Sequence, residues 1–240
     1  SNEDNAVNYE PGSGSTIMAY AGITTKDVQG NSDDYFHAGS INQVQTNMTG
    51  KTCDVETALG HGAPVVNAGA DYTIPKSTPF TLTGSATDSG GGALTYCWEQ
   101  YDDASGASQL CSITNVSAGD NDCVPIATKT TGPVFRSYQP TSSSSRTFPL
   151  LQSVLNASVS TTGSEIAVEF LPSVARTLNF RLTARDNSIV GGGGLTNFED
   201  MIVTVANKDA LTVTYPSVAN SSIYAIGSTQ TVTWTSAGNS

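Results

Sequence analysis

The chain has 240 residues and a formal net charge of -11, so it lacks the basic surface that binding to nucleic acid requires. The same charge argues against docking on anionic lipid, and no run approaches the roughly 20 apolar residues of a membrane-spanning helix. Charged residues make up only 13% and hydrophobic residues 38%. We therefore expect a surface rich in Ser, Thr, Asn and Gly, and a secreted or cell-surface β protein whose export signal was removed or lies outside the chain.

Residues 1–16 are polar and rich in Gly and Ser, which predicts a loop, and a short apolar patch follows at residues 17–22. A helix is predicted from Ser32, because Ser is a good N-cap and Asp33 and Asp34 place negative charge in the first turn. Gly50 is a plausible stop. The residues at helical spacing on one face are His37, Ile41, Val44 and Met48. This face needs a partner to bury against.

The runs YEPGSGSTIMAYAG and NSDDYFHAGSINQV in this region carry a resemblance to a known family. Over about residues 9 to 45 the chain resembles the end of the catalytic domain of secreted bacterial reprolysin-like metallopeptidases, which belong to the metzincin clan. The resemblance implies that Met18 is the Met-turn residue beneath the zinc ion of the parent protease. It also implies that Tyr20 is the tyrosine of the Met-x-Tyr spacing, which can approach the metal.

The chain departs from the metzincin pattern in one decisive respect, because it contains no HExxH. Its two histidines, His37 and His61, are 24 positions apart (61 minus 37). Two histidines one helical turn apart and a glutamate are what make zinc-bound water a nucleophile. We therefore expect the chain to be inactive alone, with Zn²⁺ and a protein substrate belonging only to the parent protease.

Four cysteines suggest an oxidising compartment and allow three disulfide connectivities. The preferred pairing is Cys53–Cys97 and Cys111–Cys123, since the second pair brackets one polar loop and Cys97 lies on the strand face opposite Trp98. Residues 53–62 are interpreted as a linker in which His61, flanked by glycines, is an exposed histidine.

From residue 63 the pattern changes to that of strands with one buried face. Apolar and polar residues alternate at residues 80–83, 94–99 and 178–185, and Trp98 is in phase with the apolar set. Core packing of Trp98 is favoured over a carbohydrate platform. Residues 63–207 resemble PKD-type and related immunoglobulin-like domains, with a long excursion between Asp102 and Arg176 that includes a helical turn around 150–155. Residues 208–240 are interpreted as the first strands of a further immunoglobulin-like domain.

The turns of this predicted sandwich contain candidate ligands for calcium. Asp71, Asp88, Asp186 and Asn187 flank strand ends, and calcium prefers six to eight oxygen ligands. The alternative is that these residues form turns in which their side chains cap backbone amides.

The predicted fold is therefore mainly β: an immunoglobulin/PKD-like β-sandwich preceded by a Met-turn and an α-helix. Residues 1–52 form the remnant of the catalytic domain, 53–62 a linker, 63–207 the sandwich, and 208–240 the start of another domain. The expected function is a non-catalytic C-terminal fragment of a secreted zinc metalloendopeptidase, with the sandwich as spacer, stabiliser or substrate-docking domain. The rival is a free-standing adhesion or carbohydrate-binding module whose first 55 residues are only an arm. The oligomeric state is left open.

Overall fold

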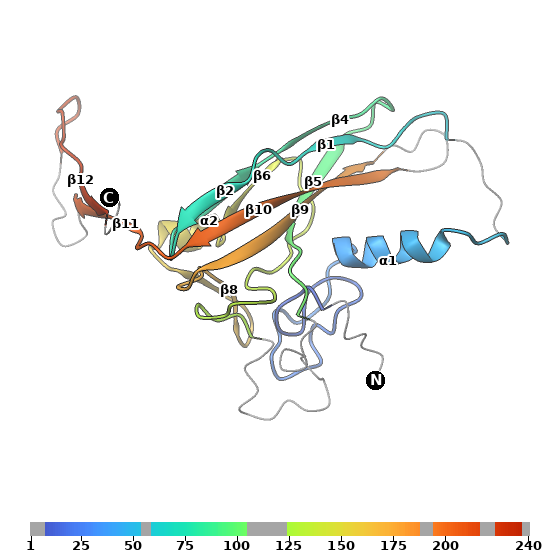
Figure 1. Ribbon diagram of the computed structural model, residues 1–240, viewed down its shortest axis with the longest axis horizontal. Coiled ribbons are helices and arrows are strands. Elements are labelled where there is room, and N and C mark those ends of the chain that lie inside the picture. Colours follow the sequence, from blue (N-terminus) through green and yellow to red (C-terminus); the bar gives the residue numbers. More distant parts are fainter. Residues whose placement is uncertain (1–7, 54–58, 105–123, 188–193, 217–223, 237–240) are drawn as a thin grey trace.

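The structure is a computed structural model that describes residues 8–53, 59–104, 124–187, 194–216 and 224–236. It is mainly β, as the alternating sequence predicts (Figure 1). The two helices described are α1 (Ala38–Met48) and α2 (Leu151–Leu155). The strands are β1 (Val65–Asn67), β2 (Tyr72–Pro75), β3 (Phe80–Thr83), β4 (Ser85–Thr87), β5 (Leu94–Gln100), β6 (Ser145–Phe148), β7 (Ser160–Thr162), β8 (Ala167–Phe170), β9 (Arg176–Asp186), β10 (Thr196–Ala206), β11 (Leu211–Tyr215) and β12 (Thr233–Ser236).

The largest sheet contains four strands in the order β2–β10–β9–β5. Strand β2 runs parallel to β10, and the other neighbours are antiparallel. The long strands β9 and β10 pair continuously from Arg185 opposite Thr196 to Arg176 opposite Val205. Because successive side chains point to opposite faces, this sheet has an inner apolar face and an outer face that carries polar residues. Strands β1 to β10 and the segments that connect them are called the sheet body below.

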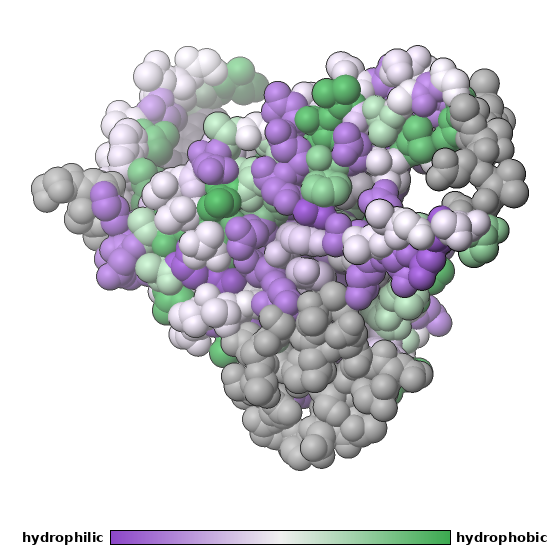
Figure 2. Space-filling model, turned by 45° about the vertical axis from the view of Figure 1, so that its right-hand side comes forward, coloured by the Kyte–Doolittle hydropathy of each residue, from purple (hydrophilic) through white to green (hydrophobic). Residues whose placement is uncertain are grey.

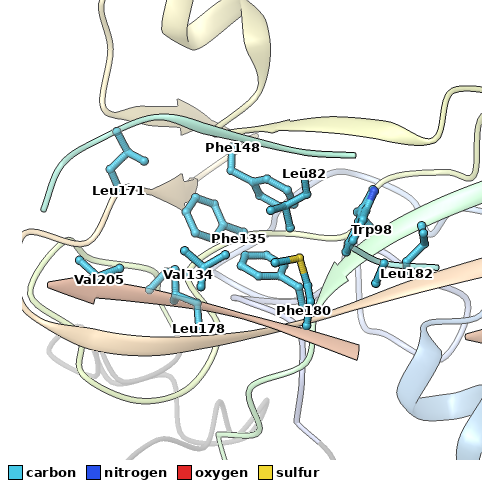
Figure 3. Close-up of a cluster of buried hydrophobic side chains, with 13 residues drawn as sticks. Leu82, Trp98, Val134, Phe135, Phe148, Leu171, Leu178, Phe180, Leu182 and Val205 are labelled. Atoms are coloured by element: carbon cyan, nitrogen blue, oxygen red, sulfur yellow. The ribbon is translucent and has the colours of Figure 1, made fainter. Parts of the chain in front are cut away.

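The hydrophobic core lies between the inner face of the four-stranded sheet and the β3–β6 pair (Figure 3). Its centre is a group of four phenylalanine rings, with the centroids of Phe148 and Phe180 4.7 Å apart. Trp98 is 3% exposed and donates from Nε1 to the Ser144 carbonyl at 2.9 Å, so the prediction that it is a core residue is confirmed. The buried core residues are Ala68, Leu82, Trp98, Val134, Phe135, Phe148, Leu171, Leu178, Phe180, Leu182, Met201, Val203 and Val205.

Residues 8–37, called the N-terminal segment below, contain no helix or strand yet pack closely against the sheet body (Figure 1, dark blue). Val28 is 1% exposed, and its carbonyl accepts the N–H of Ser164 at 3.1 Å. Glu165 Oε2 accepts the N–H of Asp27 at 2.9 Å, and the N–H of Glu165 donates to the Asp27 carbonyl at 3.1 Å. The segment is therefore attached to the sheet body and is not a loose arm.

The N-cap of α1 lies five residues later than the sequence suggests (37 minus 32), so the prediction of an N-cap at Ser32 is wrong. The N-cap is His37, whose Nδ1 accepts the N–H of Gly39 at 3.0 Å. On the helix face that needs a partner, His37 is buried and Ile41 is half-buried. Val44 is 56% and Met48 49% exposed, so the second half of this face lies at the surface of the described structure. The helix ends at the predicted place, with Gly50 at a φ of 79° immediately after the C-cap.

The predicted helical turn around residues 150–155 is present as α2. The two predicted strands of the last segment are also present, and β11 and β12 form a separate antiparallel pair. All residues of this pair except Tyr215 are exposed. The pair follows directly on β10, and the Lys208 carbonyl accepts the N–H of Lys76 at 2.9 Å.

Candidate functional site

A buried carboxylate joins the N-terminal segment to the sheet body. Glu99 lies on β5, on the face opposite Trp98, and its side chain is fully buried. One oxygen, Oε2, accepts the N–H of Ala38 at 2.9 Å, and Oε1 accepts the hydroxyl of Ser137 at 2.5 Å. Because Ala38 is the first residue of α1, the carboxylate lies at the helix end whose dipole favours negative charge. Glu99 therefore fixes the start of the helix to the sheet.

Three further side chains complete this group, which we call the Glu99 cluster (Tyr35, His37, Cys97, Glu99 and Ser137). Tyr35 donates its hydroxyl to Ser137 Oγ at 2.7 Å, and burial raises the pKa of Tyr35 far above its usual value. The Nε2 atom of His37 lies 3.7 Å from Glu99 Oε1. Cys97 contacts the carbonyl of Tyr138 at 3.2 Å through Sγ.

The Glu99 cluster contains a serine, a histidine and a carboxylate, but it does not have the geometry of a hydrolase. In a catalytic triad the serine hydroxyl donates to the histidine, whereas here Ser137 donates to Glu99. Ser137 is only 2% exposed, so a substrate has no access to it. Burial raises the pKa of Cys97 to about 12, which leaves its thiol protonated and unreactive near neutral pH. The cluster therefore positions the N-terminal segment.

The predicted Cys53–Cys97 disulfide is absent, since Cys53 is exposed, Cys97 is buried and both thiols are free. The sequence placed Cys97 correctly on the face opposite Trp98 but could not show that residues 137 and 138 cover that face. The predicted Cys111–Cys123 pair lies outside the described residues.

An aromatic and cationic stack extends the attachment along the outer face of the sheet. The rings of Tyr9 and Tyr101 are stacked with centroids 4.4 Å apart. The guanidinium of Arg181 lies 3.9 Å from the centroid of Tyr101 and 3.5 Å from that of Phe198. Arg181 also makes two bonds to Asp200, at 2.7 and 2.8 Å. Sequence reasoning missed this stack because its members come from four separate segments. Only tertiary contacts bring Tyr9 and Tyr101 to the side chains of β9 and β10.

The predicted Met-turn residues lie on the surface of the N-terminal segment. Met18 is 66% exposed, so its side chain is not buried beneath another group in the described structure. The preceding turn is held by Glu10, whose Oε1 accepts the N–H groups of Ser15 at 2.8 Å and Thr16 at 3.1 Å. The N–H of Tyr20 donates to the Ser13 carbonyl at 2.9 Å. The backbone on both sides of Met18 is therefore fixed.

The four predicted calcium ligands do not gather in one place. Asp71 accepts the N–H of Ile202 on β10 at 2.8 Å. Ile202 is six residues along β10 from Thr196 (202 minus 196), and Thr196 pairs with Arg185, the neighbour of Asp186 on β9. At about 3.3 Å per residue, Asp71 is roughly 20 Å along the sheet from Asp186. Asn187 uses its amide to donate to the Ala93 carbonyl at 2.7 Å. Asp71 therefore accepts a backbone amide of a distant strand, whereas Asn187 donates to a backbone carbonyl.

Asp88 and Asp186 remain near one another, and they lie beside His61. We call His61, Asp88 and Asp186, with Gly90 between them, the His61 corner. The Nδ1 atom of His61 lies 3.5 Å from Asp186 Oδ2, and the side chains are 9% and 0% exposed. Backbone N–H groups, first that of Gly90, hold the pKa of Asp88 below its usual value, and His61 contributes in the same direction. The interpretation of His61 as an exposed linker histidine is therefore wrong.

In the described residues no three His, Cys, Asp or Glu side chains form a group that could hold a metal ion. Within the same residues no helix has both the length and the apolar character needed to cross a membrane. On the face shown in Figure 2, hydrophobic residues occur as small separate patches among hydrophilic ones. Comparison with protein-family models, curated proteins and solved structures gives no match.

Proposed function

We propose that the chain is a non-catalytic C-terminal portion of a secreted zinc metalloendopeptidase of reprolysin-like type. In this proposal the sheet body is an immunoglobulin/PKD-like sandwich that supports the last segment of the protease domain. The observation that carries the proposal is the attachment of the N-terminal segment, which bears the resemblance, to the sheet body. In this attachment Glu99 accepts the N–H of Ala38, which follows the segment directly, and Ser137 accepts the hydroxyl of Tyr35. The ring of Tyr101 stacks on that of Tyr9.

The exposed side chains of the N-terminal segment support a docking role. Ile17, Met18 and Ile23 are 47%, 66% and 72% exposed, although the backbone around them is fixed by internal bonds. Contiguous apolar surface marks interaction sites, and in this proposal the three side chains belong to one such surface. In the proposed protein this surface packs against the zinc-binding part of the protease, and Met18 lies beneath the metal there.

The proposal assigns no catalytic residue to this chain. The sequence contains no HExxH, so the zinc ligands and the general base would come from the preceding part of the protease. The parent enzyme would cleave peptide bonds of a protein substrate with zinc-activated water. The role of the sheet body would be to stabilise the protease domain and to act as a spacer or substrate-docking domain.

The rival proposal, a free-standing adhesion or carbohydrate-binding module, has less support. Trp98, the candidate considered for a carbohydrate platform, is a core residue at 3% exposure. Its expected N-terminal arm makes buried contacts, including the Ser15 hydroxyl to the Ser137 carbonyl at 3.4 Å.

The test uses the reading frame that contains these 240 residues. The codons upstream of Ser1 should encode HExxHxxGxxH, and the encoded protein should cleave casein with an activity that a zinc chelator abolishes. The 240-residue chain alone should not cleave casein when zinc is added. An upstream sequence without the zinc motif, or zinc-dependent proteolysis by the 240-residue chain, would refute the proposal.

A further inference from the structure

The β11–β12 pair has one apolar face and one face of hydroxyl groups. Leu211 and Val213 lie on the same side of β11, and Trp234 lies directly opposite Val213 on β12. On the other side the hydroxyls of Thr214 and Thr233 bond to each other at 2.8 Å. The polar side is therefore satisfied within the pair. We call the apolar side, formed by Leu211, Val213 and Trp234, the β11–β12 face.

The β11–β12 face is open to solvent in the described structure. Leu211 is 54%, Val213 49% and Trp234 58% exposed. Figure 1 shows the pair at one end of the molecule, outside the sheet body (red). An apolar sheet face is stable when another layer of structure packs on it. Within the described part of the chain no such layer covers these three side chains.

The segment that carries this face has no charge, although the chain is strongly acidic. From residue 210 to residue 240 the sequence contains no Asp, Glu, Lys, Arg or His, whereas the net charge of the chain is -11. Acidic surfaces of two copies repel each other. A contact between copies is therefore least opposed at this uncharged segment, and a charged partner would find no complementary charge there.

We propose that the 240-residue chain forms a dimer in which the β11–β12 faces of two copies pack against each other. The face is complementary to itself, because its bulky side chain, Trp234, lies on one strand and the smaller Leu211 and Val213 lie on the other. A twofold axis along the strands places each indole against the aliphatic side chains of the second copy. The two pairs then form the two layers of a small sandwich.

The proposal commits to a second copy because a carbohydrate ligand fits this face less well. A sugar ring stacked on Trp234 also requires polar groups beside the indole that fix its orientation. The neighbours of Trp234 on this face are aliphatic, and the threonine hydroxyls lie on the opposite side.

The size of the face predicts a weak, concentration-dependent dimer. A standard stable interface buries about 800 Å² on each partner. One large aromatic side chain buries about 150–250 Å², and the β11–β12 face has a single aromatic residue. The proposal is independent of the proposed function, because dimer formation requires neither the zinc motif nor proteolysis.

The experiment is sedimentation equilibrium of the 240-residue chain from micromolar to near-millimolar concentration, at low and at high sodium chloride. We expect the average mass to rise toward that of a dimer. The affinity should increase with salt, because screening weakens the repulsion between the two acidic bodies. Tryptophan fluorescence gives a second readout: the chain has two tryptophans, and Trp98 is already in the core, so a blue shift with concentration reports burial of Trp234.

Two variants with the same added charge test which side of the pair is used. Val213→Lys places an ammonium group in the β11–β12 face and should weaken the dimer about tenfold or more. Thr212→Lys, on the neighbouring residue of the opposite side, should stay within twofold of the unchanged chain. A monomer at every concentration, an equal effect of the two variants, affinity that falls with salt, or fluorescence that does not shift would overturn the proposal.

Discussion

Replacing Glu99 by Ala is the most informative perturbation of this structure, because one carboxylate holds both α1 and the N-terminal segment. Its oxygens accept the N–H of Ala38 at 2.9 Å and the hydroxyl of Ser137 at 2.5 Å. The substitution leaves both donors buried without their acceptor. Each unsatisfied buried donor costs about 1–3 kcal/mol. We therefore expect the free energy of unfolding to fall by about 2–6 kcal/mol, the sum for two such donors.

The assay is urea unfolding at pH 7, followed by tryptophan fluorescence, with limited tryptic digestion of the native protein. Glu99→Ala should speed cleavage at Lys26, because the N-terminal segment is released from the sheet body. The control is Asp209→Asn, which removes the exposed ion pair to Lys76 at 3.3 Å. An exposed pair contributes about 0–1 kcal/mol, so the control should barely change stability.

In Glu99→Ala, lower stability and release of the N-terminal segment should occur together. A change in unfolding free energy below about 1 kcal/mol, within the range of exposed pairs, would contradict it. Unchanged cleavage at Lys26 in a destabilised Glu99→Ala variant would also contradict it. In that case the carboxylate would stabilise the sheet body without holding the segment.

Three further outcomes follow from the buried groups. At pH 8 iodoacetamide should alkylate Cys53 and spare Cys97, whose pKa of about 12 leaves roughly one thiolate in 10⁴; equal labelling in peptide maps of the native protein would refute this. Phe180→Ala should lower the unfolding free energy in urea by about 3–5 kcal/mol, and a loss below 1 kcal/mol would contradict the packing of the core. Burial raises the pKa of Asp102 in the folded state. The contribution of this residue to the free energy of unfolding is therefore full below its pKa in the unfolded chain, and it is lost as pH rises through its pKa in the folded protein. Unfolding free energies measured from about pH 3 to 7 should therefore fall with pH more steeply in the unchanged chain than in Asp102→Asn, and parallel profiles would refute this.

The strands of the sheet body could be predicted because their burial follows the period of the backbone. Leu178, Phe180 and Leu182 alternate with polar residues and lie on one buried face of β9. Trp98 shares this phase on β5 and is a core residue. The apolar pattern was therefore sufficient to identify the inner face of these strands. It did not show that Glu99 and Arg181, on the opposite face, are buried as well by polar contacts with other segments.

The start of α1 could not be predicted because tertiary bonds outweighed the local capping signal. Asp33 resembles a first-turn residue, but its N–H donates to the Ser15 carbonyl at 2.7 Å and its carboxylate lies 3.6 Å from Arg136. His37 caps the helix instead, beside Glu99. A propensity is a weak guide wherever long-range partners compete for the same groups.

The N-terminal segment and the His61 corner escaped prediction for a related reason. Their burial depends on polar contacts between residues far apart in the chain, such as Glu99 with Ala38 and His61 with Asp186. Such pairs have no periodicity in the sequence. Single residues with ordinary turn-forming character, among them Asp88 and Gly90, gave no sign that they would meet a histidine.

The polar attachment of the N-terminal segment also limits how this polypeptide can be recombined. An apolar contact tolerates many partners, whereas the Ala38–Glu99–Ser137 bonds require particular donors and acceptors at particular positions. A chimaera that joins residues 8–48, which include Ala38 and α1, to a foreign sandwich would leave the Ala38 N–H without its acceptor. The two parts should therefore be transferred between proteins as one inherited unit, with the cut placed beyond both of them.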